Sequence, residues 1–145
     1  MRARSLLMAA FLSTLVLFSF HLLSQSSKAI TLAAAVDIKP NTLNLNMKGR
    51  WLTVYIGLPE GYNVTDINQS TIMLEDLFSP EWSNIECGML MAKFDASTVI
   101  DYLWGQLYHM GGRRGVVDLR IAGQLIDGTQ FSGSDKITIM DPIKN

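Results

Sequence analysis

The chain has very few of the residues that bind metals or cross-link a small domain. Its 145 residues include one cysteine, Cys87, and two histidines, of which only His109 lies outside the N-terminal segment. A single cysteine forms no disulfide within the chain, so a hydrophobic core must hold the fold, and we expect Cys87 to be a small buried filler. One cysteine and one histidine also fall short of the ligands of an ordinary zinc site. We therefore predict no metal site and no cofactor.

Recognisable catalytic patterns are lacking as well. His109 falls on a predicted helix, and no phrase typical of a nucleophilic serine or cysteine lies near it. The acids that could pair for glycoside hydrolysis have plainer roles, with Asp95 as a helix cap, Asp101 on a polar helix face and Asp118 on an outer strand face. We predict that the chain is not an enzyme and has no catalytic residues.

Charge is absent from residues 6–23, which read "LLMAAFLSTLVLFSFHLL". Arg2 and Arg4 precede this run and a polar "SQSSK" follows it, which is the pattern of a secretory signal. Small residues allow cleavage after Ala29 or after Ala35. A helix of this length would also span about 27 Å, nearly the thickness of a bilayer core, so an uncleaved membrane anchor is the alternative. In both cases we expect an extracytoplasmic domain that is secreted or tethered through residues 6–23.

These features divide the chain into three parts. Residues 1–35 form the signal peptide or anchor, a hydrophobic helix with its linker; residues 36–141 form one folded domain, and residues 142–145 a tail. Residues 1–35 hold three of the twelve basic residues, which leaves nine basic against thirteen acidic residues, a net charge of −4. This mild acidity argues against nucleic acid as a partner, because nucleic acid is bound by clustered lysine and arginine.

Hydrophobic residues alternate along most of the folded part. In "RWLTVYIGL" the aliphatic residues share one face of a strand and the aromatic residues the other, and similar short strands are predicted near residues 36–45, 72–74, 88–94, 117–125 and 136–140. The stretch "DASTVIDYLWGQLYHM" has the spacing of a helix instead, with its cap at Asp95, its last apolar residue at Met110 and its stop at Gly111. The pattern predicts a mainly β fold, a β-sandwich with one short helix.

Oxygen-bearing side chains gather in "DGTQFSGSD", residues 127–135. Counted from Asp127, the third, fifth and sixth positions do not hold the residues that a calcium loop of the EF-hand type requires. A phosphate loop would need a lysine and a following helix, whereas a strand is predicted to follow. We therefore predict the turn of a β-hairpin, with corners at Asp127-Gly128 and Gly133-Ser134 and with Phe131 packed between them.

Three phrases together carry a resemblance to a known family. They are "VDIKPNTLNLNMKGRWLTVYIGLPEGYNVTDINQSTIML", "GMLMAKFDASTVIDYL" and "GQLIDGTQFSGSDKITIM". In this order they resemble a β-sandwich module of archaeal and bacterial exported surface proteins. The resemblance implies an Ig-like or cohesin-like sandwich of Greek-key topology, used as a structural or adhesive unit without known catalytic activity. Members of that family often carry an Asp-rich insertion before the second phrase, and because this chain has "FSPEWSNIEC" there, no calcium role carries over.

Exposed aromatic residues are the main binding candidates. Trp51 and Tyr55 lie on the same face of one predicted strand, opposite its aliphatic residues, and could form a platform on which sugars stack. The alternative is that these rings pack inside the protein. Trp82, in a predicted loop, is a further candidate of the same kind.

Two glycosylation patterns fall in the predicted loop "EGYNVTDINQS". "NVT" begins at Asn63 and "NQS" at Asn68, and an exported chain is the context in which such sites are used. The sequence as a whole predicts a non-enzymatic structural or adhesion module at the cell surface, whose partners are cell-surface proteins or polysaccharide. A carbohydrate-binding module that uses Trp51 and Tyr55 is the alternative.

Overall fold

The computed structural model of the protein describes residues 30–142, so the predicted hydrophobic helix and its cleavage sites up to Ala29 lie outside the described residues. The described part contains one α-helix, α2 (Ala96–His109), and one short 3-10 helix, η1 (Val64–Asp66). Its strands are β1 (Thr31–Ala33), β2 (Ala35–Lys39), β3 (Thr42–Asn44), β4 (Trp51–Gly57), β5 (Ile67–Leu74), β6 (Trp82–Glu86), β7 (Met89–Asp95), β8 (Arg114–Leu125) and β9 (Gln130–Met140). The prediction of a mainly β fold with one helix is confirmed for this part.

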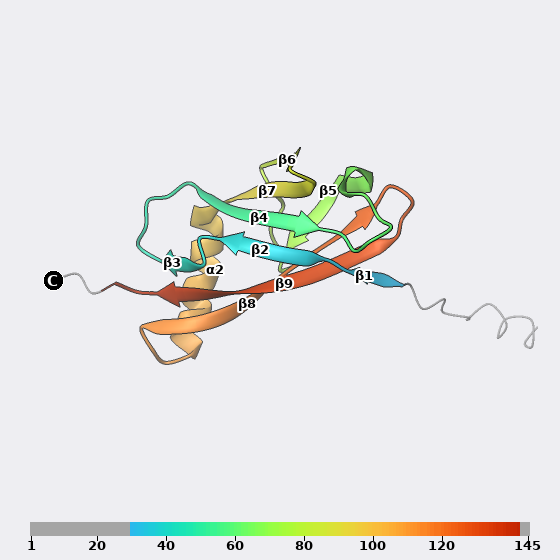
Figure 1. The fold of residues 1–145 in the computed structure, drawn as a ribbon. Coiled ribbons are helices and arrows are strands. Elements are labelled where there is room, and N and C mark those ends of the chain that lie inside the picture. The colour runs from blue at the N-terminus through green and yellow to red at the C-terminus, as the bar shows by residue number, and fades with distance from the viewer. Residues whose placement is uncertain (1–29, 143–145) are drawn as a thin grey trace, which may run out of the picture.

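The strands form two sheets, as a β-sandwich requires (Figure 1). One has five strands in the order β1-β9-β8-β5, with β3 also paired to β9, and the other has four strands in the order β2-β4-β7-β6. The chain changes sheet between β1 and β2 and again between β2 and β3, so its first three strands connect the two sheets. The short β1 and β3 both run parallel to β9.

Alternation of side chains explains why the two sheets pack against each other. In β4 the residues Leu52, Val54 and Ile56 have no exposed surface, while the residues between them are half-buried. Side chains of a strand alternate between its faces, so one face of each sheet can be apolar throughout. Phe94 of β7 and Phe131 of β9 are the largest fully buried side chains and contribute one from each sheet to the single core.

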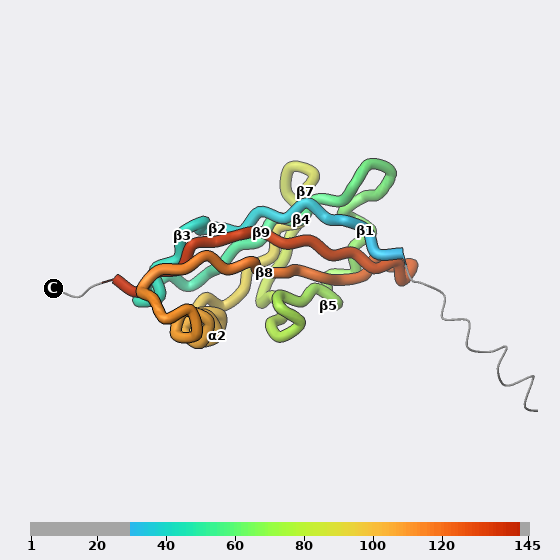
Figure 2. The backbone as a smooth tube through the Cα atoms, turned by 90° about the horizontal axis from the view of Figure 1, so that it is seen from below, coloured from blue at the N-terminus to red at the C-terminus, as the bar shows by residue number. Residues whose placement is uncertain are grey.

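Helix α2 closes one open side of the sandwich, where it contacts strands of both sheets (Figure 2). The Asp95 carboxylate accepts a hydrogen bond of 3.0 Å from the Ser97 N–H, and Gly111 takes the left-handed conformation just after the helix with φ of 68°. The predicted cap and stop are therefore confirmed. The apolar stripe ends at the buried Leu107 rather than at Met110, which is exposed. Among the helices of residues 30–142, none is long and apolar enough to cross a membrane.

The sandwich begins earlier than residue 36, the predicted start of the folded domain. Strand β1 pairs with β9 from Thr31, and its Leu32 is only 8% exposed. The chain then crosses to the other sheet at Ala34, whose N–H donates a 2.8 Å hydrogen bond to the Ser132 carbonyl. The crossing is possible because residue 133 is a glycine; a Cβ at this position would overlap the Ala34 carbonyl oxygen. Residues 31–35 thus belong to the folded domain and not to a linker.

The hairpin predicted at residues 127–135 has one corner instead of two. A turn at Asp127-Gly128 joins β8 to β9, the Asp127 carboxylate accepts a 2.8 Å hydrogen bond from the Thr129 N–H, and Gly128 has φ of 88°. The second predicted corner, Gly133-Ser134, lies inside β9, where the glycine serves the close approach of Ala34. The prediction that Phe131 packs inward is confirmed.

Two segments predicted as loops are strands. Trp82 opens β6, an edge strand paired with β7, and Asn68 lies in β5, which begins at Ile67 rather than near residue 72. Both strands lack the clean alternation of a half-buried strand, because β6 lies at a sheet edge and β5 changes register between Asn68 and Met73.

The expectation for Cys87 was wrong. Its side chain is exposed and sits with Gly88 at the tip of the β6–β7 hairpin, with φ of 50° and 75° at the two residues. The apolar run that suggested burial starts after this tip, at Met89, so the cysteine belongs to the turn and not to the strand.

Candidate functional site

The outer face of the β2-β4-β7-β6 sheet carries the aromatic residues that the sequence singles out. Trp51 and Tyr55 are half-buried on this face, and the aliphatic residues of β4 point into the core. Four positions of extended chain, about 13 Å, separate the two residues. They therefore form two separate contact points rather than one stacked pair.

Strand register brings further side chains beside these two. Tyr55 lies opposite Met91 of β7, and Trp82 of β6 lies opposite Lys93, which in turn lies opposite Thr53 of β4. Neighbouring strands are about 4.8 Å apart, so Trp82 is only about 10 Å across the sheet from β4. We call this set the aromatic face; it consists of Trp51, Thr53, Tyr55, Trp82, Met91 and Lys93. Sequence analysis missed that Trp82 joins it, because the strand pairing of β6 is not visible in the local pattern.

Two cations lie over the tryptophan rings of the aromatic face. The Arg50 guanidinium carbon is 4.6 Å from the Trp51 ring centroid, and the Lys93 ammonium is 5.2 Å from that of Trp82. Each contact stabilises the ring position by about 0.5–1 kcal/mol at an exposed site. One side of each ring is therefore occupied by a cation, while Trp82 still keeps 44% of its surface exposed.

The two asparagines of the glycosylation patterns are both exposed. The Asn63 side chain caps η1 by accepting a 3.0 Å hydrogen bond from the Thr65 N–H. The Asn68 side chain accepts a 2.7 Å hydrogen bond from the Ser70 hydroxyl. Both side chains use their carbonyl oxygens in these contacts, so the amide nitrogens, which would carry a glycan, are not the contacting atoms. Glycosylation of either residue stays a prediction.

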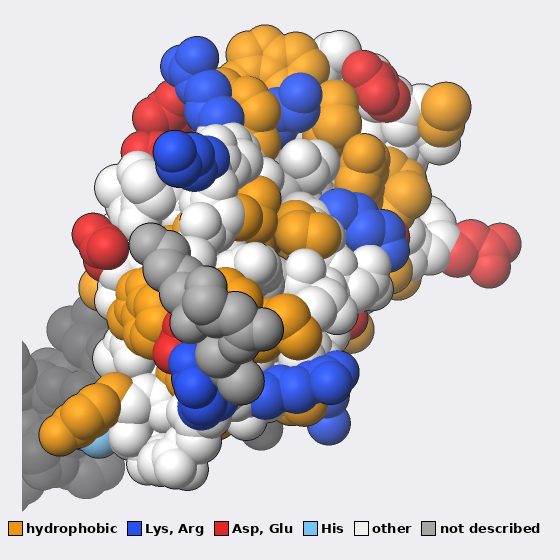
Figure 3. All heavy atoms as spheres, turned by 90° about the vertical axis from the view of Figure 1, so that its left-hand side faces the viewer, with side chains coloured by type: hydrophobic (Ala, Val, Ile, Leu, Met, Phe, Trp, Pro, Cys, Tyr) orange, Lys and Arg blue, Asp and Glu red, His pale blue; other side chains and the backbone are white. Residues whose placement is uncertain are grey.

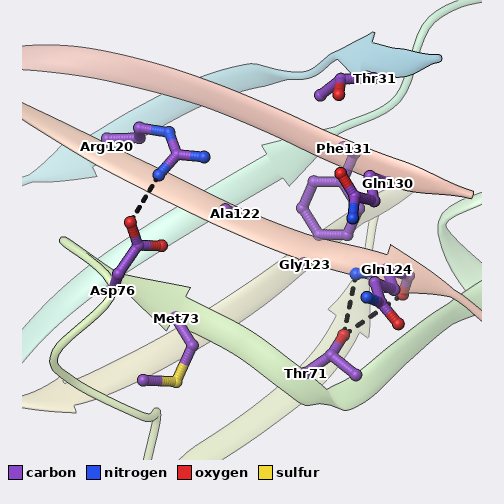
Figure 4. Close-up of a pocket in the computed structure, with 10 residues that line it drawn as sticks. All are labelled: Thr31, Thr71, Met73, Asp76, Arg120, Ala122, Gly123, Gln124, Gln130 and Phe131. Carbon is purple, nitrogen blue, oxygen red and sulfur yellow. Dashed lines mark hydrogen bonds and ion pairs between the residues drawn. The ribbon is translucent and has the colours of Figure 1, made fainter. Parts of the chain in front are cut away.

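A shallow hollow of about 260 Å³ lies on the outer side of the other sheet (Figure 4). At one end Arg120 and Asp76 form an ion pair of 2.8 Å, and at the other the Thr71 hydroxyl accepts a 2.8 Å hydrogen bond from the Gln124 N–H. Between them the Phe131 ring packs against Gly123, where a side chain would overlap it, and the ring is only 1% exposed. The lining offers hydrogen bonds and one neutralised ion pair, but only one carboxylate, so it does not hold the pair that glycoside hydrolysis uses.

Three described side chains, Asp95, Asp127 and Tyr102, have shifted pKa values, and each shift has a structural cause. Hydrogen bonds from Ser97 lower the pKa of Asp95, and those from Thr129 lower the pKa of Asp127, which is the effect of a helix cap and of a turn. Burial raises the pKa of Tyr102, and its hydroxyl donates a 3.0 Å hydrogen bond to Glu75. The second Glu75 oxygen accepts from the Arg120 N–H, so this carboxylate ties α2 to β8. Of these groups, only Tyr102 faces a second ionisable group across a hollow of the described residues; that group is Glu75, and their contact is the hydrogen bond just described.

Basic residues from separate parts of the sequence are spread over the end of the sandwich where β2 and β9 finish (Figure 3). They are Lys39, Lys48, Arg50, Arg113 and Arg114. Lys39 pairs with Asp37 at 2.8 Å and Arg113 with Asp141 at 3.2 Å, while Arg50 lies over Trp51. Neighbouring acids thus neutralise part of this charge, whereas Lys48 and Arg114 take part in none of the ion pairs of residues 30–142.

The described residues contain no cluster of histidine, cysteine and acidic side chains that could hold a metal ion. His109 is exposed near the end of α2 and lies edge-on to the Tyr108 ring. No protein-family model and no curated protein matches this chain.

Proposed function

We propose that the chain is a non-enzymatic structural or adhesion module that acts outside the cytoplasm at the cell surface. The leader pattern of residues 6–23 supports export, and the resemblance of residues 36–141 to modules of surface proteins supports the role and an Ig-like or cohesin-like Greek-key sandwich. If residues 6–23 remain as an anchor, they tether the sandwich at the end where Ile30 enters it, opposite the end at which β9 finishes (Figure 1). The end of the sandwich where β2 and β9 finish, which carries Lys39, Arg113 and Arg114, then points away from the membrane.

The aromatic face is the contact surface in this proposal, and its composition is the observation that supports it. Tryptophan, tyrosine, methionine and arginine are the residue types enriched at the centres of protein interfaces. Here Trp82 and Tyr55 lie partly exposed on the outer sheet face, while Met91 of β7, beside Tyr55, is only 7% exposed and supports the face from within. A sheet face with partly exposed rings offers a contact area without rearrangement of the backbone.

The geometry favours a protein partner over a sugar. Stacking of a sugar needs an open ring face, and Arg50 and Lys93 each occupy one face of a tryptophan. The same cations can form hydrogen bonds to carboxylates or carbonyls of a protein partner. Carbohydrate binding through Trp51 and Tyr55 is the second candidate, because Tyr55 has no cation over its ring among the described residues and is partly exposed.

Ring-removal variants of residues 30–145 test the proposal. Tyr55→Ala combined with Trp82→Ala should weaken binding to intact cells about tenfold or more, as expected when interface anchors are lost. Tyr108→Ala is the matched control, since it removes a ring that is 84% exposed on α2, far from the aromatic face. Cells treated with protease should bind neither the wild type nor the variants.

Two results would overturn the proposal. If the double variant binds like Tyr108→Ala, the aromatic face is not the contact surface. If binding survives protease treatment and soluble surface polysaccharide competes for it, the carbohydrate candidate replaces the protein partner. Thermal unfolding of each variant without a partner verifies that the fold is intact.

A further inference from the structure

Strand β6 is the last strand of its sheet, and one of its edges is free. In the order β2-β4-β7-β6 it pairs with β7, and Figure 1 shows it at the upper margin of the fold. Among the described residues, β7 is the only element that runs alongside β6. The other sheet reaches it through a side chain, since the Ser83 hydroxyl donates a hydrogen bond to the Gln69 side chain. Ser83 shares the inner face of β6 with Ile85, which packs against the core, so this contact lies beneath the sheet.

The free edge presents the backbone groups of two residues, Ser83 and Ile85. The β6–β7 hairpin has a two-residue turn, and such a turn is closed by a hydrogen-bonded pair, here Glu86 and Met89. Hydrogen-bonded pairs recur at every second residue of an antiparallel ladder, so the even-numbered residues of β6 bond to β7. The N–H and C=O groups of Ser83 and Ile85 therefore point away from β7, out of the free edge.

The sequence of β6 offers little protection against pairing with another strand. "WSNIE" contains neither proline nor lysine, two residues that commonly protect edge strands. The side chains of its outer face, Trp82, Asn84 and Glu86, are all exposed. The ion pairs of residues 30–142 involve neither Glu86 nor Lys93, which lies opposite Trp82 on β7. Both backbone and charge at this edge are thus available to a partner.

We propose that a second copy of this chain pairs with the free edge, with the two β6 strands antiparallel about a two-fold axis at Asn84. In this register Ser83 lies opposite Ile85 of the second copy, so the outward N–H and C=O groups of the two copies meet. Asn84 lies opposite Asn84 of the second copy, and two amide side chains, which both donate and accept, can bond to each other. Every residue of β6 has a partner in this register.

Charge complementarity favours a second copy as the partner. The same register places Glu86 of the second copy opposite Trp82, on the outer face of the sheet. Lys93 lies on the other side of Trp82, and its ammonium extends over the Trp82 ring, 5.2 Å from the ring centroid. Each copy thus brings a carboxylate to a cation of the other, twice by symmetry. Opposite charges across paired strands stabilise the pairing.

Neighbouring registers use the edge less well. An axis at Ser83 pairs Ile85 with Glu81 of the second copy, whose N–H already donates a 2.9 Å hydrogen bond to a carbonyl of β7. An axis at Ile85 pairs Ser83 with Cys87, which lies in the turn with φ of 50° and is not extended. An axis between two residues pairs odd-numbered with even-numbered residues, so outward groups meet groups that bond to β7. The backbone of β6 therefore selects the Asn84 register.

The pairing joins the two β2-β4-β7-β6 sheets into one continuous sheet. The two-fold axis that relates antiparallel neighbours stands perpendicular to their sheet, so the aromatic faces of both copies lie on the same side. A dimer then presents two contact surfaces to one target, which raises the strength of attachment without any new contact. The inference itself does not depend on what the aromatic face binds.

A cysteine cross-link tests the register directly. Asn84 and its copy form a pair without mutual backbone hydrogen bonds, whose Cα atoms are about 4.5 Å apart, within the range that a disulfide spans. In the full-length chain purified in mild detergent, with Cys87→Ser as background, Asn84→Cys should form a disulfide-linked dimer under mild oxidation. Ile126→Cys, which is 74% exposed in the β8–β9 turn, is the matched control and should stay monomeric. A cross-link in Asn84→Cys no stronger than in this control would overturn the inference.

Charge exchange provides an independent test on the same background. Lys93→Glu or Glu86→Lys alone replaces two opposite-charge pairs by two like-charge pairs and should reduce the Asn84→Cys cross-link about fivefold. The double variant K93E/E86K restores opposite charges between the copies and should restore the cross-link, although the cation over Trp82 from its own chain is still missing. A double variant that behaves like the single ones contradicts the proposed register. Tyr55→Ala should leave the cross-link unchanged, so this inference and the proposed function fail separately.

Discussion

Backbone conformation at single residues decides several local features of this protein. The β6–β7 hairpin turns through Cys87 and Gly88, both left-handed, in the manner of a two-residue hairpin turn whose preferred sequence is Asn-Gly. Glycine adopts this conformation freely, whereas for a residue with a Cβ it costs about 1 kcal/mol or more, and the cost is smallest for asparagine. Cys87 is thus a strained position on the surface and not part of the core.

Cys87→Asn should raise the free energy of unfolding by about 0.5 kcal/mol, because asparagine tolerates the left-handed conformation better. Urea denaturation of residues 30–145 followed by tryptophan fluorescence measures the change. Cys87→Ser keeps the unfavourable conformation and removes the thiol, so it should denature like the wild type. A gain of the same size in Cys87→Ser would show that the thiol, and not the backbone, is responsible.

Among the elements, α2 depends on its first turn for its place in the fold. Its N-cap Asp95 ends β7 and begins the helix without a connecting loop, and it lies opposite Trp51 in the sheet. The Ser97 N–H and hydroxyl both donate to its carboxylate, at 3.0 and 2.8 Å. These bonds favour the ionised form and hold the pKa of Asp95 below its ordinary value of 3.8. Ionised Asp95 therefore stabilises the junction of strand and helix.

The contribution of Asp95 to stability should depend on pH in one direction. Because its pKa is lower in the folded state, the stabilisation is fully present above pH 3.8 and is lost as the pH falls through the lowered value. Asp95→Asn, which keeps a neutral cap, should melt below the wild type at pH 7, and the difference should vanish in acid. Thermal melts across this range measure it. Asp101→Asn removes an equal charge from the same helix, and an equal closing gap in that variant would contradict the assignment to the cap.

In the molecule as a whole, two short strands from the N-terminal part of the chain pair with β9, the last strand. β1 covers the start of β9 and β3 covers its finish, and between them the Asp135 carboxylate accepts a 2.8 Å hydrogen bond from the Ile38 N–H of the other sheet. Strands β1 and β3 thereby cover the two ends of this edge of β9, whereas the edge of β8 has no strand partner beyond Arg120 and lies beside α2. The N-terminal strand β1 is part of the sandwich, although it lies within residues 1–35, which the sequence predicts as a leader with its linker.

A fragment that begins at residue 36 should be less stable than one that begins at residue 30. Loss of β1 removes the buried Leu32 and exposes the edge of β9, which costs roughly 2 kcal/mol in the free energy of unfolding. Urea denaturation of the two fragments measures the difference, and Thr31→Ala in the longer fragment controls for an exposed change in β1. Equal stability would mean that β1 adds nothing. The expected result favours cleavage after Ala29 over Ala35, since only the former keeps β1.

Local patterns in the sequence were sufficient for the features that depend on near neighbours. Period-two alternation determined β4, β7 and β8, the Asp95 cap and Gly111 determined the limits of α2, and Asp127-Gly128 determined the turn before β9. Each of these results from interactions within a few residues. The tertiary structure alone decided what depends on pairing between distant segments. Trp82 lies on the same sheet face as the aromatic residues of β4, and Cys87 lies outside the core. Strand β1 is part of the sandwich, and half of one edge of β8 has no strand partner. Edge strands bury few side chains, so their position is set by the hydrogen bonds of a partner strand and leaves little trace in their own sequence.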